Sequence, residues 1–164
     1  MWWWRKVRNH TYWRPEADLH PEGLSYYVHD VALRPNEEGL SLYAAIDHSE
    51  ANNVAHYFAL TQMGYDKLDY LLIPDGTWDA FGFRPELVPC TNIPPYLSTR
   101  HYEVRGLTET LTTRLAEIIL GDASRQACRA KRGDVLRVAP TYLDAEPALR
   151  QFLHEEWEAK LFPG

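Results

Sequence analysis

The sequence predicts an α+β fold: a single compact domain over residues 1–164, with a mostly antiparallel sheet and helices packed on one side of it. The chain has 164 residues, of which 45% are apolar, and this suits one domain with a buried core. Short runs of strand-forming residues are bounded by turn residues, and longer stretches carry apolar residues at helical spacing. The strands are not separated by regular helical crossovers, which argues against a parallel, dinucleotide-binding type of sheet.

The first part of the chain is expected to form strands and one helix. Strand-forming residues dominate the segments 5–13, 24–33 and 40–46. The first of these segments should end before Pro15, and a polar turn at 34–39 should join the other two. Asp47 or Ser49 can accept hydrogen bonds from the first free amides of a helix, and Gly64 is a natural end for it.

The second part of the chain alternates strands and helices around a proline-rich connection. The expected elements are a buried strand at 68–73, an irregular connection at 74–95, a strand at 99–105, a helix at 108–121, a short basic helix at 122–132, a short strand at 135–138 and a helix at 147–161. Five of the 11 prolines lie between residues 74 and 95, and this density rules out a long helix there.

The charge of the chain is unevenly distributed. The formal net charge is −6, but residues 1–14 contain four bases and no acid, so the remaining 13 bases and 23 acids give the rest of the chain −10. An acidic body argues against broad contact with a phosphate backbone. We expect no membrane span, because no apolar run approaches the length that crosses a bilayer. The start of the chain lacks a secretion signal and the two cysteines form no Cys-x-x-Cys pair, so a cytoplasmic location is expected.

His48 and Glu50 form the first candidate catalytic pair. Zinc deaminases place a His-x-Glu motif at a helix start and add a Pro-Cys-x-x-Cys segment. Here the sequence contains His48-Ser49-Glu50 and Pro89-Cys90, but position 93 is isoleucine, where a second sulfur ligand is required. A capped helix start explains His48 and Glu50 equally well. We therefore expect no cofactor, with zinc only under this alternative.

His101 and Glu103 form the second candidate catalytic pair. Enzymes that transfer ADP-ribose combine a His or Arg, an aromatic residue and a Glu from separate strands, and His29, His56 and Tyr57 are further residues of these types. On a strand, side chains alternate between faces, so His101 and Glu103 should share a side while Tyr102 points away. Such a pair can transfer protons, or it can be an exposed polar pair.

The N-terminal residues form a candidate binding surface. Tryptophan and basic residues occur together at Trp2, Trp3, Trp4, Arg5, Trp13 and Arg14. Because Trp and Arg dominate binding hot spots, we expect these residues to contact a protein partner or to pack on the chain itself. Stacking on nucleic-acid bases and contact with a membrane interface remain open alternatives. If this surface only docks a partner, deleting residues 1–14 should abolish capture and leave the fold intact.

One segment resembles a known group of sequences. Residues 31–43 read Val-Ala-Leu-Arg-Pro-Asn-Glu-Glu-Gly-Leu-Ser-Leu-Tyr. This Arg-Pro-x-x-Glu-Gly-Leu-Ser segment resembles one in small uncharacterised bacterial proteins, and the similarity extends over residues 20–65. The resemblance implies two strands joined by a turn, a following helix and a bacterial origin, and it implies no activity.

The leading functional hypothesis is a macromolecule-binding accessory protein of a bacterial conflict or defence system, with another protein as its partner. One alternative is a small enzyme that acts on a nucleotide or nucleic acid, in which His48, Glu50, His101 and Glu103 converge on one pocket. A single-stranded nucleic-acid binder, with salt-sensitive affinity, is the other alternative. The substrate, the partner and the oligomeric state stay open.

Overall fold

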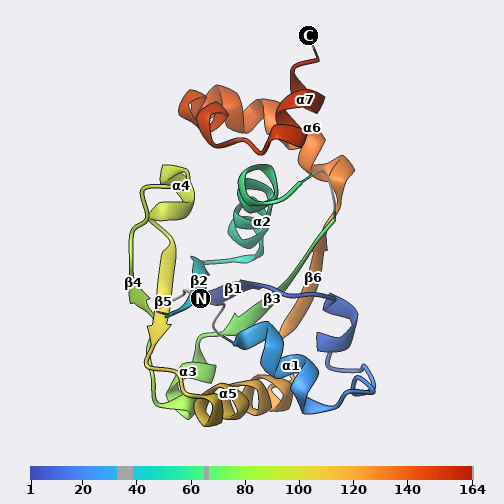
Figure 1. Ribbon diagram of the computed structural model, residues 1–164, viewed down its shortest axis with the longest axis vertical. Helices are drawn as coiled ribbons and strands as arrows, with labels where there is room; N and C mark the ends of the chain where they lie inside the picture. Colours follow the sequence, from blue (N-terminus) through green and yellow to red (C-terminus); the bar gives the residue numbers. More distant parts are fainter. Residues whose placement is uncertain (33–38, 65–66, 164) are drawn as a thin grey trace.

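The computed structural model describes residues 1–32, 39–64 and 67–163, and its centre is an antiparallel sheet (Figure 1). The strands in the described ranges are β1 (Trp2–Lys6), β2 (Gly39–Ala45), β3 (Leu68–Pro74), β4 (Glu86–Leu87), β5 (His101–Arg105) and β6 (Gln126–Ala130). Their order across the sheet is β4-β5-β2-β1-β3-β6, and every neighbouring pair is antiparallel. The predicted α+β class with a mostly antiparallel sheet is confirmed.

Helices surround this sheet. The α-helices in the described ranges are α1 (Leu24–Val31), α2 (His48–Gln62), α3 (Gly76–Phe81), α4 (Pro95–Ser98), α5 (Glu109–Gly121), α6 (Arg132–Ala145) and α7 (Glu155–Leu161). Two 3₁₀ segments, η1 (His10–Trp13) and η2 (Pro147–Phe152), complete the set. No helix in the described parts of the chain is long and apolar enough to cross a membrane.

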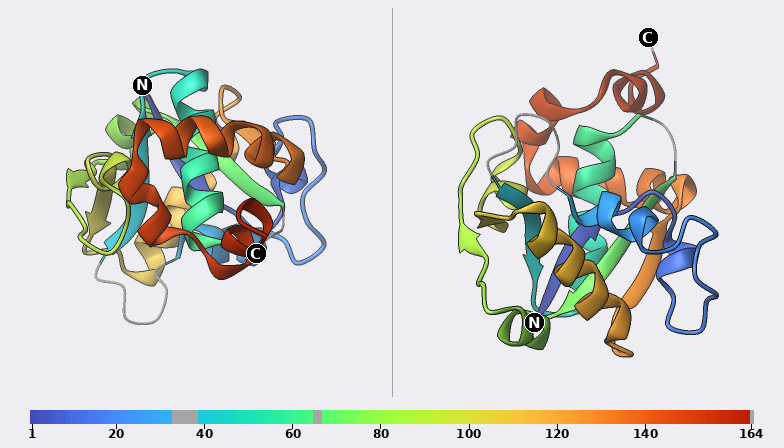
Figure 2. Two further views of the ribbon diagram at one scale, coloured as in Figure 1. Left: turned by 90° about the horizontal axis from the view of Figure 1, so that it is seen from above. Right: turned by 60° about the horizontal axis from the view of Figure 1, so that its bottom comes forward.

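The helices cover both faces of the sheet, whereas the sequence predicted helices on one side. On one face, α2 packs on the strands, with α6 and α7 stacked beyond it at the top of Figure 1. On the other face, α1 and α5 lie side by side, with α3 next to them (Figure 2, right). Each face has its own hydrophobic cluster, so strands that are apolar on both faces, such as β3, can be fully covered.

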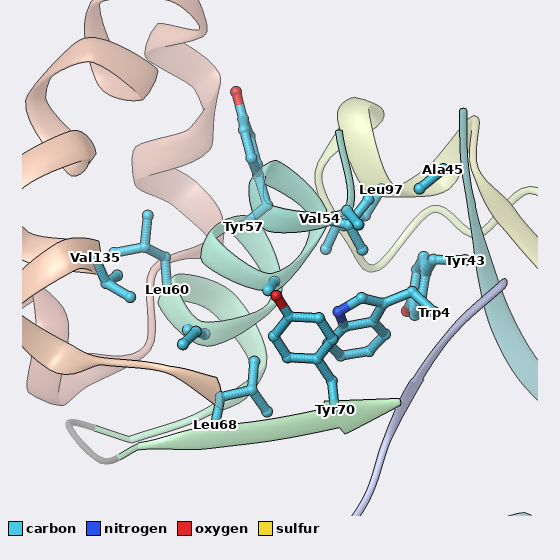
Figure 3. Close-up of a cluster of buried hydrophobic side chains, with 14 of the residues drawn as sticks. Trp4, Tyr43, Ala45, Val54, Tyr57, Leu60, Leu68, Tyr70, Leu97 and Val135 are labelled. Atoms are coloured by element: carbon cyan, nitrogen blue, oxygen red, sulfur yellow. The ribbon is translucent and has the colours of Figure 1, made fainter. Parts of the chain in front are cut away.

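The consecutive tryptophans of β1 are explained by this double cover. β1 lies between β2 and β3, and alternation turns Trp3 and Trp4 to opposite faces. Trp3 joins the cluster under α1 and α5, whereas Trp4 joins the cluster under α2 and stacks on Tyr70 (Figure 3). Both indoles are therefore buried, although they are neighbours in the chain.

Several predicted elements occur where the sequence placed them. The expected strands at 40–46, 68–73 and 99–105 correspond to β2, β3 and β5, and the expected helices at 47–64 and 108–121 correspond to α2 and α5. The predicted helix at 147–161 is divided into η2 and α7. Within the connection at 74–95 the structure adds the short elements α3 and β4.

The predicted strand at 24–33 is wrong, because residues 24–31 form α1. Its buried residues include Tyr26, Tyr27, Asp30 and Val31, a spacing that places them on one side of a helix. The preceding prediction of a strand over 5–13 is also too long, since β1 ends at Lys6 and η1 follows. Residues 33–38, most of the predicted turn at 34–39, lie outside the described residues.

Two predictions near the C-terminus are wrong, because a strand lies where a helix was predicted and a helix lies where a strand was predicted. The predicted basic helix at 122–132 contains β6 instead, and the predicted strand at 135–138 lies inside α6. Pairing with β3 decides the first case, because the Arg129 guanidinium in β6 lies opposite the buried Asp69 carboxylate in β3. Non-local pairing of this kind overrides local propensity.

Candidate functional site

A cavity of about 280 Å³ opens on the face of the sheet that α2 covers. It lies over β1, β2 and β5, beside the last turns of α2 and the segment before α4. Its apolar wall contains Trp4, Tyr43, Phe58 and Ile93. Its polar and ionisable lining includes Lys6, Ser41, Gln62, Asn92, His101 and Glu103. This volume is near the lower end for small-molecule sites and suits a metabolite.

The His101 imidazole is a buried part of the cavity wall. Its Nδ1 lies 2.7 Å from the Val88 carbonyl oxygen and 3.2 Å from the Cys90 Sγ. A carbonyl oxygen only accepts hydrogen bonds, so Nδ1 must carry a hydrogen and donate it to Val88. The basic atom of the neutral ring is then Nε2, and in the described part of the chain no hydrogen bond involves that atom.

The Cys90 thiol is held next to this imidazole but is not activated by it. Burial raises the pKa of Cys90, and the nearby Glu103 carboxylate raises it further. Because Nδ1 of His101 already donates to Val88, it cannot accept the thiol proton in this arrangement. Cys90 therefore contributes a protonated, polarisable group to the lining and is not a thiolate nucleophile.

The predicted side-sharing of His101 and Glu103 is observed. Alternation along β5 places His101 opposite Tyr43 and Glu103 opposite Ser41, and both side chains line the cavity. Tyr102 points to the other face, where its ring meets Trp3 with 5.0 Å between centroids. The Glu103 carboxylate accepts a hydrogen bond from Arg105 Nε at 3.0 Å.

Cys90 is one of the lining residues that the sequence did not place at this cavity, and Phe58, Gln62 and Asn92 are others. The sequence linked this thiol to His48, but it lies at His101, 11 residues further along the chain. The prolines at positions 89, 94 and 95 are the available signal, because such density turns the chain back on itself. In the structure the Val88 N–H donates to the His101 carbonyl oxygen at 2.9 Å, which closes this turn.

His48 and Glu50 do not join His101 and Glu103. Glu50 lines a second cavity, with Asp47, Asn53, Tyr96 and Arg100 among its neighbours. The exposed His48 ring lies against Trp2, and its Nε2 is 2.6 Å from the Gln126 side-chain oxygen. The predicted convergence of all four residues on one pocket is therefore not observed.

Glu50 has a clear structural role. Its carboxylate accepts the Ile46 backbone N–H at 2.7 Å and pairs with the Arg100 guanidinium at 2.5 Å, while the Asp47 side chain caps α2 by accepting the Glu50 N–H. Partial burial acts to raise the pKa of Glu50, but the bonds from Ile46 and Arg100 outweigh it and the pKa is lowered. Glu50 therefore stays ionised, and its carboxylate stabilises the start of α2 through its bonds to Ile46 and Arg100.

The residues required for zinc are not brought together. Among residues 1–32, 39–64 and 67–163 there is no group of three or more His, Cys, Asp and Glu residues placed to hold a metal ion. His48 lies at Trp2 and Gln126, whereas Cys90 lies at His101. The residues of the zinc alternative thus do not fit a shared site in this structure.

The residues grouped around the second candidate pair are also dispersed. His29 is exposed on α1, at the opposite face of the sheet. His56 lies within 3.0 Å of the Tyr142 hydroxyl, and Tyr57 stacks on Tyr96. Neither His29, His56 nor Tyr57 lines the cavity at His101.

Most of the six residues predicted as an N-terminal binding surface, called the N-terminal cluster below, are buried in the hydrophobic core. Trp3, Trp4 and Trp13 are buried, and so is Arg5. The Arg5 guanidinium donates to the backbone carbonyl oxygens of Asp30, Ser41 and Ala32. The indole N–H groups of Trp3 and Trp13 donate to the carboxylates of Asp75 and Asp30. These side chains cannot form a docking surface for a protein partner while the chain is folded, although Trp4 and Arg5 border the cavity at His101.

Two members of that cluster remain at the surface. Trp2 is half-buried against His48, and Arg14 is exposed, with its guanidinium 3.2 Å from Nε2 of His10. Of the six residues predicted for docking, only Trp2 and Arg14 therefore reach the surface.

The chain was compared with protein families, curated proteins and solved structures, and no family model, curated protein or solved structure matches it.

Proposed function

We propose that this protein is a small enzyme that transfers a proton on a metabolite-sized substrate bound in the cavity at His101. The observation that carries the proposal is the anchoring of His101: its Nδ1 donates to the Val88 carbonyl oxygen at 2.7 Å within the cavity wall. A backbone acceptor on Nδ1 fixes the tautomer and orients the ring, which is how histidine bases are commonly held.

The chemistry assigns a separate role to each residue. His101 Nε2 takes a proton from a hydroxyl, an amide or a water molecule at the substrate, and the ring becomes positively charged. Glu103 lies two residues along the same strand face, about 7 Å away between Cα atoms, and its carboxylate faces the same cavity, where it accepts a hydrogen bond from the substrate.

A substitution that removes Nε2 but keeps the anchor tests the proposal. Asn at position 101 can still donate to the Val88 carbonyl oxygen, so His101→Asn should fold. We expect wild-type protein to convert at least one member of a pool of nucleosides, nucleotides, amides and esters, followed by mass spectrometry. His101→Asn should lower that rate at least about 100-fold, whereas the exposed His29→Asn should not change it.

The outcomes are separated by a second variant. Glu103→Gln keeps the shape of the side chain, and we expect it to lower the rate about tenfold or more. Thermal unfolding of each variant shows whether it is folded. Absence of conversion by the wild-type protein, or equal rates for wild type and a folded His101→Asn, would overturn the proposal.

A second candidate function is partner docking, and exposed apolar side chains favour it. Trp2 pairs with Ala45 between β1 and β2, so the next residues, Met1 and Ile46, lie close to the same corner, with 58% and 75% of their surfaces exposed. We propose a protein partner for this corner, within a bacterial conflict or defence system in the cytoplasm. Both cysteines are free, which is in keeping with that compartment.

Site-specific photo-crosslinking tests this second candidate. A photoreactive residue at Ile46 should give one discrete cross-linked product in living cells, and one at the equally exposed Leu19 should give none. If both positions give the same products, or if neither gives any, this corner is not a docking surface.

A further inference from the structure

The cavity at His101 has a wall made of aromatic rings in different orientations. Trp4 and Tyr43 meet at 76°, Tyr43 and Phe58 at 75°, and Trp4 and Phe58 at 44°, with centroids 4.9 to 5.8 Å apart. Each pair is braced by packing of α2 on β1 and β2. Trp4 and Tyr43 are almost fully buried, whereas Phe58 is half-buried, so the flat apolar surface that a planar ligand can contact is mainly that of Phe58.

Polar groups with paired donors and acceptors stand at the mouth of the same cavity. Gln62 ends α2 and Asn92 precedes α4, and both side chains are exposed while they line the cavity. A carboxamide offers a donor and an acceptor side by side, which matches the paired donors and acceptors on the edge of a nucleobase. Ser41 adds a hydroxyl from β2.

The volume of the cavity limits the size of the ligand, and its charged lining residues affect where a charged group of the ligand would lie. A volume of about 280 Å³ holds a base of one or two rings, and leaves little space for the sugar. The lining contains both the positive Lys6 and the negative Glu103, so its charge does not select the charge of the ligand, and Lys6 marks one side of the cavity where an anionic group is favoured.

From this geometry we propose that the cavity binds a nucleobase, as a nucleoside or a nucleotide, with the ring against Phe58, in the apolar corner that Trp4 and Tyr43 complete, and its polar edge toward Gln62 and Asn92. The inference rests on the proposed function and deepens it, since it names the class of substrate that would meet His101. The sugar would lie at the mouth, where a phosphate would approach Lys6.

Ligand-observed NMR and calorimetry with defined compounds test this inference. The probes are adenosine, guanosine, cytidine and uridine, their 5′-monophosphates, and benzoate and choline as aromatic-acid and cation controls. We expect saturation transfer to the base protons of at least one nucleoside. We also expect that compound to bind more tightly than benzoate or choline. If the phosphate contributes, the monophosphate of the same base binds more tightly than its nucleoside, and the difference shrinks with added salt.

Variants of two exposed residues and of the half-buried Phe58 test the mode of binding, and thermal unfolding of Phe58→Leu shows that it is folded. Gln62→Ala and Asn92→Ala should each lower the affinity for the nucleoside about threefold to tenfold, as expected for one lost hydrogen bond. Phe58→Leu should lower the same affinity about tenfold, because stacking on the aromatic ring is lost. The matched control is Gln151→Ala, an exposed carboxamide on η2, which should bind like the wild-type protein.

The outcomes distinguish this inference from the proposed function. If no nucleoside or nucleotide binds, or if binding is the same in Gln62→Ala, Asn92→Ala and Phe58→Leu, the nucleobase assignment is wrong, whatever substrate His101 converts. If a nucleoside binds as expected but His101→Asn converts it at the wild-type rate, the assignment stands and the catalytic role of His101 fails.

Discussion

At the scale of residues, the anchored His101 shows how one backbone carbonyl oxygen defines a candidate base. The Val88 oxygen holds the hydrogen on Nδ1 and leaves Nε2 as the basic atom of the neutral ring. The same hydrogen bond prevents Nδ1 from activating the Cys90 thiol 3.2 Å away. A cysteine, a histidine and a glutamate in one cavity therefore do not form a nucleophilic triad here, because the hydrogen bonds are distributed differently.

The buried Asp69 makes the stability of the protein depend on pH. The Arg129 guanidinium donates to both of its oxygens, at 2.5 and 2.9 Å, and the His10 backbone N–H donates to one of them at 3.3 Å. Burial acts to raise the pKa of Asp69, but these hydrogen bonds outweigh burial and lower the pKa below its usual 3.8. A lowered carboxylate pKa stabilises the fold above the unfolded-state pKa, and this stability is lost as pH falls through the folded-state pKa.

We therefore expect Asp69→Asn to lower the free energy of unfolding by about 2 kcal/mol near neutral pH. The difference from the wild-type protein should shrink as the pH falls from about 5 to about 2, because Asp69 becomes protonated in the wild type. Urea unfolding at several pH values measures this. The control is Asp18→Asn at an exposed position. A difference that stays constant down to the lowest pH would contradict the role given to Asp69.

At the scale of elements, the central strand β1 decides what the N-terminal tryptophans do. β1 pairs with β2 on one side and β3 on the other, so it cannot be removed without leaving two long strand edges unpaired. Trp3 and Trp4 occupy the two hydrophobic clusters, one on each face. Four of the six residues that the sequence suggested as a docking surface, Trp2, Trp3, Trp4 and Arg5, thus lie in the middle of the sheet.

Deletion of residues 1–14 should therefore unfold the protein. Loss of the central strand and of three buried tryptophans removes more stabilisation than a typical domain has in reserve. We expect circular dichroism without a folded spectrum and elution as an expanded or aggregated chain. In contrast, the double variant Trp2→Ser and Arg14→Ser should stay folded, because these two side chains reach the surface. A folded deletion variant would restore the docking interpretation of the whole cluster.

At the scale of the whole molecule, the two hydrophobic clusters share strands, and we expect them to unfold as one cooperative unit. They lie on opposite faces of the same strands, so neighbouring residues of β1 and β3 contribute to each. α7 completes the cluster on the α2 face through the buried Trp157, and the His154 N–H at its start donates to the Leu60 carbonyl oxygen of α2 at 2.9 Å. Loss of packing at α7 should therefore affect the entire domain.

We expect Trp157→Ala to lower the free energy of unfolding by about 3 to 5 kcal/mol, as is typical when a fully buried Trp is truncated. Tryptophan fluorescence and far-UV circular dichroism should follow a single denaturant transition that is shifted as a whole. Phe162→Ala, at a more exposed position of the same region, should shift it by less than about 1 kcal/mol. Two separate transitions in Trp157→Ala would show that the C-terminal helices unfold on their own.

The sequence by itself determined the α+β class, the strands β2, β3 and β5 and the helices α2 and α5, because each has a local pattern of strong periodicity or a capping residue such as Asp47. It also determined that His101 and Glu103 share a side, since alternation along a strand depends on no other part of the chain.

Only the tertiary structure decided the rest. α1 is a helix where a strand was predicted, because its buried residues follow helical spacing. β6 is a strand where a helix was predicted, because pairing with β3, including Arg129 with Asp69, outweighs local propensity. The same non-local contacts buried Trp3, Trp4 and Arg5, separated Glu50 from His101, and placed Cys90 beside that imidazole. Such contacts join residues far apart in the chain, and local sequence patterns do not show which distant residues lie close together in space.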